Sequence, residues 1–265
     1  METSRLTGDR IKQYLSHGKR FDARLPDEFR DIVIETNVSN KAEGSVRVKL
    51  GKTEVVVGIK MNVSEPYPDS PNKGNLMVTA ELLPLSSPRF ESGPPKFEAI
   101  ELGRLVDRVV RESKLIDVEK LCIKEGEKVW TIFIDVYSIN DDGNLLDAAA
   151  IGALAALKNA KMTKYDDKEG KVLFGEVTNQ NVPLAKHLPF SITLYKVGDN
   201  FLVDPTREEE DVSETKINIG RSAKGIHSMQ KGGVAPVSPE EFKKGLEMSE
   251  KVYNDILKKV EKYLK

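Results

Sequence analysis

The side chains best suited to chemistry stand in one acidic run, Glu208-Glu209-Glu210-Asp211. Clustered carboxylates can hold a divalent cation or transfer protons as general acids and bases. Lys216 follows closely, and a positive charge beside such a cluster would repel a cation. We therefore favour a simpler interpretation of the run, a solvated acidic turn, and we expect no metal site.

A second candidate is a row of arginines on a predicted helix over residues 97–114. Arg104 and Arg108 stand four residues apart and Arg111 follows by three, so all three project from one side of a helix. A planar guanidinium donates forked hydrogen bonds to phosphate oxygens and stays charged, which suits RNA. The alternative is ordinary salt bridging along the helix to Glu101, Asp107 and Glu112. From spacing alone, salt bridging is favoured.

Other common chemistries lack support. The motifs GxxxxGK[ST], GxSxG, HExxH and GxGxxG do not occur. His17, His187 and His227 are too far apart in the sequence to suggest a metal site. Cys122 is the single cysteine, which excludes an intrachain disulfide and suits a reducing cytosol. Its apolar neighbours indicate a strand and an inert thiol.

Composition bounds the class of protein. The 265 residues are 39% hydrophobic and 31% charged, which is typical of a globular chain with a sizeable core. The 41 basic residues nearly cancel the 42 acidic ones, so any RNA contact must be a local patch. The charged N-terminus is unlike a signal peptide, and no apolar run approaches bilayer length. We expect a cytoplasmic protein without membrane contact.

The elements that must position these residues follow from periodicity. Runs rich in Val and Ile predict strands at residues 30–36, 44–50, 53–63, 75–83, 128–139, 190–197, 200–203, 216–220 and 226–230. Helices are predicted at residues 5–15, 97–114 and 145–160, the last of them alanine-rich and buried. Ser238-Pro239 followed by two glutamates predicts the start of a C-terminal helix.

The chain divides into two halves, each of strands followed by a helix. The charged residues 161–171 and the polar residues 178–186 interrupt the pattern between them. We therefore predict an N-terminal helix and arm over residues 1–30, a first domain over residues 31–170 and a C-terminal domain over residues 171–265.

Five segments in chain order carry a recognisable pattern: residues 75–85 (NLMVTAELLPL), 91–95 (ESGPP), 100–111 (IELGRLVDRVVR), 130–137 (WTIFIDVY) and 142–149 (DGNLLDAA). Together they resemble the RNase PH family, and within it most closely the non-catalytic ring subunits of the archaeal exosome. The resemblance extends from about Arg20 to the C-terminal helix. It implies the α/β (α+β) RNase PH fold, a ribosomal-protein-S5-domain-2-like half followed by a smaller sheet-and-helix C-terminal half.

The resemblance also implies a lost active site. Active members bind inorganic phosphate with a Gly-Gly-Ser/Thr-Arg segment before the alanine-rich helix, where a helix N-terminus and an arginine hold the oxyanion. The corresponding residues here are 143–146 (GNLL), and Leu146 can donate nothing to phosphate. Two aspartates of the active branch, six residues apart, fall on Glu210 and Lys216. These three degenerate positions imply that this chain has no catalytic residues, binds no cofactor and leaves inorganic phosphate to a partner subunit.

The resemblance implies that the row of arginines on residues 97–114 keeps a function. In the non-catalytic branch, arginines at the positions of Arg104 and Arg108 reach across a subunit interface to RNA phosphates; the role of Arg111 is the weakest of the three. The implied partners are an active RNase PH-like subunit, which forms heterodimers and a hexameric ring with this chain, RNA-binding cap proteins and single-stranded RNA, with no DNA. Three alternatives stay open: a phosphorolytic exoribonuclease active by itself, a purely structural scaffold, and a small-molecule-binding α/β protein.

Overall fold

Alternating apolar residues build a mixed sheet that forms the first half of the molecule. The computed structural model describes residues 3–264, and in them this sheet has the order β1-β2-β3-β6-β4, with β5 also paired to β6. Its strands are β1 (Ile32–Thr36), β2 (Gly44–Leu50), β3 (Thr53–Ser64), β4 (Asn75–Glu81), β5 (Cys122–Lys124) and β6 (Lys128–Asn140). The strand pairs are antiparallel except β4 with β6, which is parallel. β4 stands at one edge of the sheet, next to the helix that follows it in the chain.

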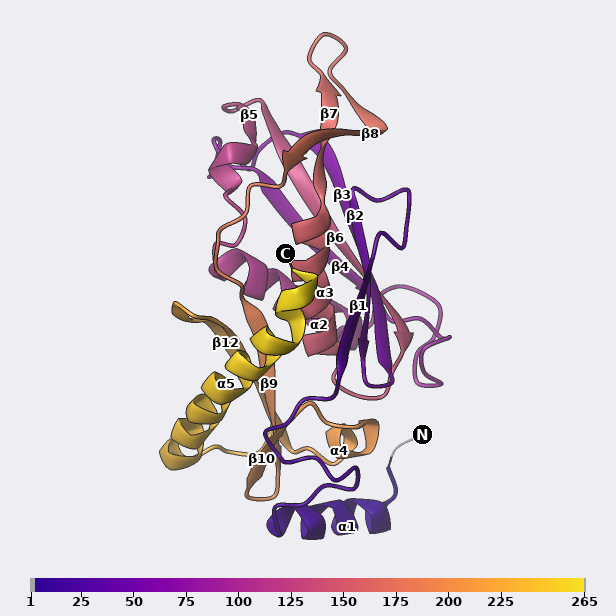
Figure 1. The fold of residues 1–265 in the computed structure, drawn as a ribbon, viewed down its shortest axis with the longest axis vertical. Coiled ribbons are helices and arrows are strands. Elements are labelled where there is room, and N and C mark those ends of the chain that lie inside the picture. Colours follow the sequence, from indigo (N-terminus) through magenta and orange to yellow (C-terminus); the bar gives the residue numbers. More distant parts are fainter. Residues whose placement is uncertain (1–2, 265) are drawn as a thin grey trace.

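Two helices cover one face of this sheet (Figure 1). α2 (Phe97–Glu112) packs along β4, and α3 (Leu145–Asn159) packs over β2 and β3. α3 is buried from Leu145 to Leu157, as its alanine-rich composition predicts. Its approach depends on Gly152, where an added Cβ would lie 2.6 Å from Cγ2 of Val57. The small residues of α3 therefore allow the helix to sit directly on the sheet.

The second half is a smaller sheet with its own helix. The order of its strands is β10-β9-β11-β12, with β9 (Phe190–Val197), β10 (Asn200–Val203), β11 (Thr215–Ser222) and β12 (Gly225–Gly233). α5 (Pro239–Val260) lies across it and reaches β1 of the first sheet. The predicted start of α5 is confirmed, since Ser238 and Glu241 form a capping box ahead of Pro239. Short 3₁₀ turns occupy Val118–Leu121 and Glu261–Tyr263.

The N-terminal helix α1 (Arg5–Ser16) packs on the second sheet, at the opposite end of the molecule from β5 and β7 (Figure 1). Ile11 and Leu15 join a small apolar cluster with Tyr195, Val197 and Leu202. Thr3 donates hydrogen bonds to Asp211 from its backbone N–H and its hydroxyl, at 3.0 and 2.9 Å. Among the described residues, no helix is long and apolar enough to span a membrane.

A hairpin between the halves departs from the sequence prediction. Residues 161–171 and 178–186 were expected to interrupt regular structure, but β7 (Lys161–Asp166) pairs with β8 (Lys171–Asn181). β8 is exposed along most of its length, and the hairpin projects from the molecule (Figure 1). The prediction was wrong because neither face of β8 is buried, so no alternation marks the strand. The predicted domain boundary at residue 170 falls in the turn of this hairpin and stays a prediction.

A buried carboxylate joins the two halves. Asp147, in the first turn of α3, accepts hydrogen bonds from the Ser191 hydroxyl at 2.7 Å and from the Thr193 hydroxyl and backbone N–H at 2.8 and 3.0 Å. Asn218 donates in turn to both hydroxyls. Complete burial raises the pKa of Asp147 to about 6 against the opposing effect of these hydrogen bonds. One carboxyl group thus ties α3 directly to β9 and, through Asn218, to β11.

This elevated pKa predicts a pH dependence of stability. Because the folded chain holds the Asp147 proton more tightly than the unfolded chain, the contribution of this group to the free energy of unfolding is largest below about pH 4 and falls as the pH rises to about 6. The full difference is about 3 kcal/mol, of which about 2 kcal/mol falls between pH 4.5 and 7. Denaturant unfolding of the wild type and Asp147→Asn at pH 4.5 and 7 measures it, with other titrating groups cancelling between the two proteins. Parallel pH profiles would contradict the assignment.

Candidate functional site

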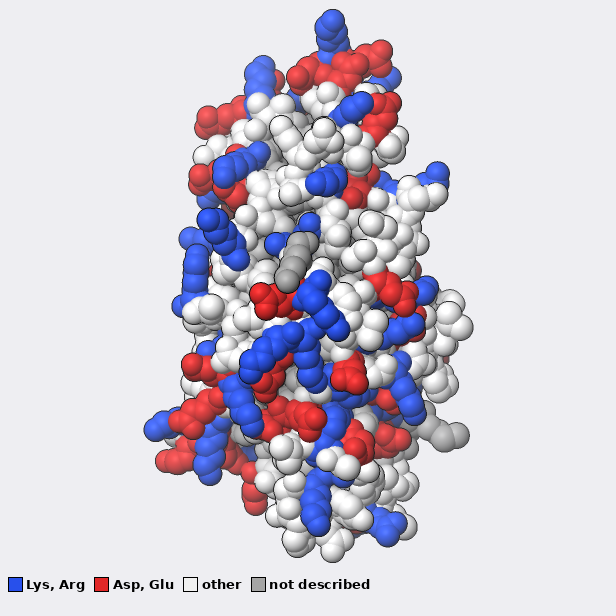
Figure 2. Space-filling model, in the orientation of Figure 1, with Lys and Arg blue, Asp and Glu red and all other residues white. Residues whose placement is uncertain are grey.

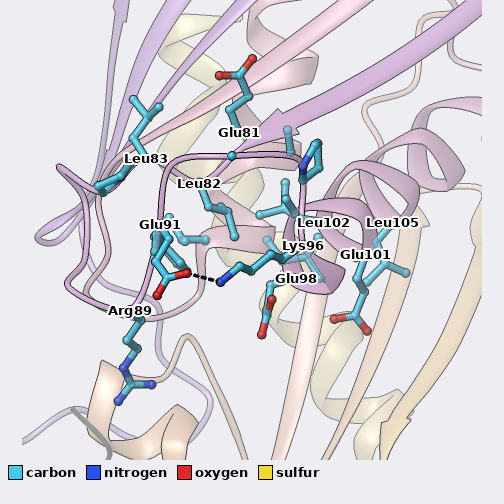
Figure 3. Close-up of a pocket in the computed structure, with 18 of the residues that line it drawn as sticks. Glu81, Leu82, Leu83, Arg89, Glu91, Lys96, Glu98, Glu101, Leu102 and Leu105 are labelled. Carbon is cyan, nitrogen blue, oxygen red and sulfur yellow. Dashed lines mark hydrogen bonds and ion pairs between the residues drawn. The ribbon is translucent and has the colours of Figure 1, made fainter.

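The three degenerate positions of the sequence converge on one cavity. It has a volume of about 640 Å³ and lies between the loop at residues 82–96, α2, the N-terminus of α3 and the second sheet (Figure 3). Leu146, Glu210 and Lys216 all line it. The fold brings these three residues together, because α3, α4 (Arg207–Asp211) and β11 meet at this cavity.

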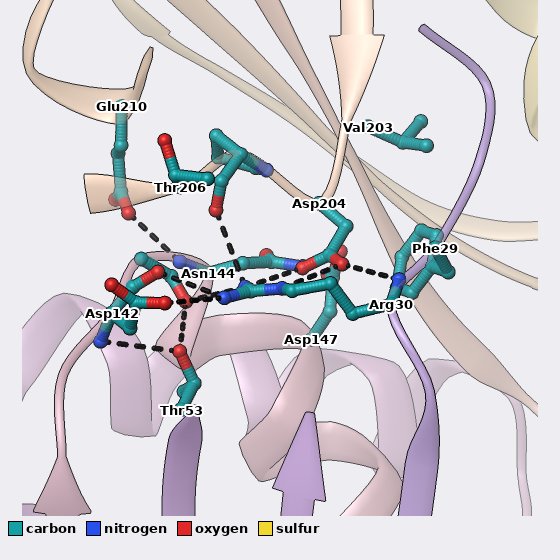
Figure 4. A network of polar contacts seen from close by, with 12 residues as sticks. Phe29, Arg30, Thr53, Asp142, Asn144, Asp147, Val203, Asp204, Thr206 and Glu210 are labelled. Atoms are coloured by element: carbon teal, nitrogen blue, oxygen red, sulfur yellow. Dashed lines mark hydrogen bonds and ion pairs between the residues drawn. The ribbon is translucent and has the colours of Figure 1, made fainter. Parts of the chain in front are cut away.

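The corner of this cavity at the N-terminus of α3, where the family resemblance implies that a phosphate site has been lost, is filled by groups of the chain itself. Leu145 and Leu146 form the first turn of α3 and are almost wholly buried. Ahead of them, the backbone N–H of Asn144 donates to the Glu210 carboxylate at 2.9 Å (Figure 4). A carboxylate at a helix N-terminus is favoured by the unpaired N–H groups and the helix dipole. Glu210 therefore supplies the negative charge that a bound anion would otherwise bring to this end of α3.

The turn before α3 is held in a left-handed backbone conformation. Gly143 and Asn144 have φ values of +85° and +57°. A Cβ on Gly143 would lie 2.5 Å from the backbone oxygen of Pro205, so this position requires glycine. The close approach brings the segment before α4 directly against the N-terminus of α3.

The acidic run is a capped helix and not a solvated turn. α4 begins at a capping box between Thr206 and Glu209. Glu209 is 3% exposed and accepts two hydrogen bonds from the guanidinium of Arg20, at 2.9 and 2.5 Å. The expectation of a solvated turn was wrong because the partner of this carboxylate, Arg20, is remote in sequence, and only the fold brings the two together.

Asp211 at the end of α4 is also fully engaged. Burial alone would raise its pKa, but hydrogen bonds from Arg89, Thr3 and Arg207, with the charge of Arg207, hold the pKa of this carboxyl well below its usual range. Arg207 Nη2 lies 2.9 Å from Asp211 Oδ1. Glu209 and Asp211 of α4 are therefore held by arginines. Within the described residues, no group of three or more His, Cys, Asp or Glu side chains is arranged to hold a metal ion.

Lys216 takes part in an ion pair between the two halves. Its Nζ lies 2.7 Å from Oε2 of Glu101 on α2, and both side chains are less than one-third exposed. The other cations lining the cavity are also paired with carboxylates: Lys96 with Glu91 (Figure 3), Arg207 with Asp211, and Arg89 with Asp211. An incoming phosphate would have to compete with a carboxylate for each of these charges.

A buried cluster of hydrogen bonds around Asp204 holds together the chain segments next to the cavity (Figure 4). Asp204 is fully buried and accepts hydrogen bonds from Arg30 Nη2 at 2.7 Å, Arg24 Nη1 at 2.9 Å and Asn144 Nδ2 at 3.1 Å. Arg30 also donates to the backbone oxygens of Asp142 and Gly143, at 2.9 and 3.0 Å. The turn before α3, the segment before α4 and the arm before β1 are thus joined at one carboxylate.

The three arginines of α2 border a separate groove of about 450 Å³ beside β4. Their surroundings differ. Arg104 is exposed and makes no hydrogen bond or ion pair with any other described residue. Arg108 is half-buried and donates to the side-chain oxygen of Gln230 at 2.8 Å and to the backbone oxygen of Met229 at 3.3 Å.

Arg111 differs from both, because its guanidinium makes two hydrogen bonds to Asp107, at 3.0 and 2.6 Å, and one to the Leu76 carbonyl. The salt bridging weighed from the sequence therefore holds for Arg111 with Asp107. Glu101 pairs with Lys216, which leaves Arg104 and Arg108 without a carboxylate among the described residues. The face of the molecule shown in Figure 2 carries both signs of charge interspersed. Arg104 and Arg108 are distinguished by their lack of acidic partners among the described residues, since the chain as a whole has no basic excess.

Two histidines that are distant in the sequence lie close together in the structure. The rings of His187 and His227 lie 5.7 Å apart between their centroids. His187 Nε2 donates to the Ser113 carbonyl at 2.8 Å, and burial, the neighbouring His187 and Lys224 lower the pKa of His227. His187 precedes β9 and His227 lies on β12 of the same sheet, and this brings together two rings that are distant in the sequence.

Comparison with known proteins identifies the class that this fold and cavity define. Two family models match the chain, domain 1 of the 3′ exoribonuclease family over residues 28–163 and domain 2 of that family over residues 187–252. The chain belongs to this family, the RNase PH family, and has its two-domain architecture.

Its relatives narrow the assignment within the family. An exosome complex component Rrp42 from Methanocella arvoryzae is 44% identical over 96% of this chain and 95% of its own length. The protein of the same name from Thermococcus kodakarensis is 44% identical over 95% of this chain and 93% of its own.

The most informative solved structures are also exosomes. A chain of the Archaeoglobus fulgidus exosome with RNA bound to the active site has a TM-score of 0.86 and 43% identity, covering 96% of this chain and 97% of that one. A chain of an archaeal exosome core has a TM-score of 0.83 and 40% identity, covering 98% and 97%.

The ion pair of Lys216 predicts the outcome of placing an acidic residue at this position. In Lys216→Asp, a carboxylate would face Glu101 in a partly buried site, so we expect a loss of about 1–2 kcal/mol in the free energy of unfolding. Lys216→Met, which removes the charge and keeps the stem, should lose less. Denaturant unfolding of both variants measures the difference. Equal stability of Lys216→Asp and the wild type would show that the pair contributes nothing.

Proposed function

We propose that this chain is the non-catalytic RNase PH-like subunit of an archaeal-type exosome, a 3′-to-5′ phosphorolytic exoribonuclease ring that degrades and processes RNA. Two observations support an exosome subunit: relatives bearing the name exosome complex component Rrp42, and the likeness to exosome chains over nearly the full length. The observation that carries the proposed role within the ring is that Arg104 and Arg108 face the groove beside β4 without a carboxylate partner among the described residues.

The proposed lack of catalysis rests on the cavity. Leu146 presents methyl groups where an active member would present a phosphate-binding arginine, and Glu210 already satisfies the N–H of Asn144. Lys216 replaces a carboxylate with a cation and is bound to Glu101. The four cations that line the cavity (Arg89, Lys96, Arg207 and Lys216) are each paired with a carboxylate, so a phosphate finds no uncompensated charge to hold it against an RNA 3′ end.

The remaining steps of the reaction then belong to other subunits. In this proposal, inorganic phosphate is used by an active RNase PH-like partner, which forms heterodimers with this chain and closes a hexameric ring of three such dimers. RNA-binding cap proteins and single-stranded RNA are the further partners, and neither DNA nor a membrane is involved. We place the assembly in the cytoplasm.

The arginines would act on the RNA backbone. Guanidinium groups bind phosphate oxygens by forked, charge-assisted hydrogen bonds that carry no base identity. Binding should therefore be weakly selective for sequence and strongly dependent on salt. Arg111 contributes least in this proposal, because Asp107 already neutralises it.

One observation favours a purely structural alternative. Arg111 is held by Asp107 and the Leu76 carbonyl, so at least one arginine of the row stabilises the contact between α2 and β4. The scaffold alternative extends this role to Arg104 and Arg108, and the experiment below separates the two.

The proposed lack of catalysis is tested by phosphate-dependent release of nucleoside diphosphates from a 3′-tailed RNA. We expect no release by this chain alone, because its cavity cannot hold phosphate, and release once the active paralogue is added. Phosphorolysis by the isolated chain, free of any paralogue, would overturn the assignment and make the chain an enzyme in its own right.

The arginine role is tested in the assembled complex by RNA affinity in phosphate-free buffer across a salt series. Replacing Arg104 and Arg108 by alanine should weaken RNA binding about tenfold or more and lower the salt slope by about one to two, because two phosphate contacts are lost. Arg10→Ala, an exposed arginine of α1, is the matched control and should leave affinity unchanged. Unchanged affinity of an intact complex carrying the double variant would favour the scaffold.

A further inference from the structure

The guanidinium of Arg108 is held by the other half of the molecule. Arg108 stands on α2 of the first half, whereas its two acceptors, the side-chain oxygen of Gln230 and the backbone oxygen of Met229, belong to β12 of the second sheet. Both acceptors lie on the same strand at consecutive residues. The orientation of this arginine is therefore set across the boundary between the halves.

β12 is a firm support for this contact. It pairs with β11 along its whole length, and Gln230 stands opposite Asn218, which is buried and bonded to Ser191 and Thr193. Met229 packs against the main apolar core. The backbone of Gln230 is thus held, through Asn218, by the Ser191 and Thr193 hydroxyls that also bind Asp147.

The acceptors of Arg108 are neutral, and in this respect Arg108 differs from Arg111. An amide oxygen and a peptide oxygen orient a guanidinium without cancelling its charge, whereas the carboxylate of Asp107 neutralises Arg111. A guanidinium has five N–H donors, so two hydrogen bonds to β12 leave others for a phosphate. Arg108 is consequently both oriented and charged.

Arg104 provides the contrast within the same row. It is exposed and makes no hydrogen bond or ion pair with another described residue, so it must lose side-chain freedom when it binds. Arg108 has lost part of that freedom in the folded chain. Orientation before binding lowers the cost of association.

We infer that Gln230 is a positioning residue that presents Arg108 to an RNA phosphate, so that the RNA-binding face is built from both halves of the chain. This inference rests on the proposed function of Arg104 and Arg108. It adds a residue that does not itself touch RNA and that the sequence gives no reason to select.

Two substitutions at Gln230 test the inference in the assembled complex, again by RNA affinity in phosphate-free buffer over a salt series. Gln230→Ala removes the side-chain acceptor and should weaken RNA binding about fivefold, since Arg108 regains its freedom. Gln230→Glu keeps the shape and strengthens the bond to Arg108, but its negative charge opposes the phosphate. It should weaken binding at least as much and reduce the salt slope by about 0.7, the equivalent of one contact to a single strand.

The same substitutions in an Arg108→Ala background complete a double-mutant cycle. There Gln230→Ala should have no effect on affinity, and the effect of Gln230→Glu should shrink, because the arginine they act on is gone. Gln13→Ala, an exposed glutamine on α1, is the matched control, and thermal unfolding of each variant checks that the fold is intact.

A merely structural Gln230 would give a different pattern. Gln230→Ala would then leave the RNA affinity of a folded complex unchanged, because orienting Arg108 would not matter for binding, and that outcome would overturn the inference. An equal effect of Gln230→Ala with and without Arg108 would overturn it as well. Loss of binding on Arg108→Ala with none on Gln230→Ala would refute the positioning role alone, whereas indifference to both Arg104→Ala and Arg108→Ala would refute the proposed function beneath it.

Discussion

The buried carboxylate of Asp204 is the interaction on which the rest of the site depends. A fully buried charge is tolerated only when opposite charges and hydrogen bonds replace its lost hydration, and Asp204 has Arg24, Arg30 and Asn144 for that purpose. Because these partners come from the N-terminal arm and the turn before α3, neutralising one charge also fixes three chain segments. The N-terminus of α3, the placement of Glu210 and the wall of the cavity all follow from this arrangement.

The chain uses two kinds of acceptor for its arginines, and the choice determines what each arginine can do. Carboxylates hold Arg20, Arg207 and Arg111, and these pairs stabilise the fold while cancelling the positive charge. Amide and peptide oxygens hold Arg108, which keeps its charge. α2 borders both the cavity and the groove, but their charges differ. In the cavity, carboxylates of the chain neutralise the lysines and arginines, whereas in the groove Arg104 and Arg108 keep an uncompensated positive charge that attracts anions.

Much of the fold could be predicted from the sequence, since burial imposes a period on it. β3 and β6 alternate, α3 is alanine-rich and buried, and Ser238-Pro239 marks the start of α5, and these predictions are confirmed. β7 and β8 escaped prediction because an exposed hairpin carries no such period. The convergence of Leu146, Glu210 and Lys216 followed from the resemblance to a family, which brought its fold with it. The partners of Arg20, Lys216 and Arg108 could not be found in this way, because each lies in another half or arm of the chain and no local pattern links the two.

The pair of Lys216 and Glu101 bears on how such a subunit can change over evolutionary time. Lys216 stands opposite Glu101, and Glu210 occupies the N-terminus of α3, so each of these charges is matched to a group fixed elsewhere in the chain. A single substitution that reverses one of them places like charges together unless its partner changes as well. Under the proposed function, a gain of catalysis would therefore need coupled substitutions, and a division of labour between the subunits of the complex would maintain itself.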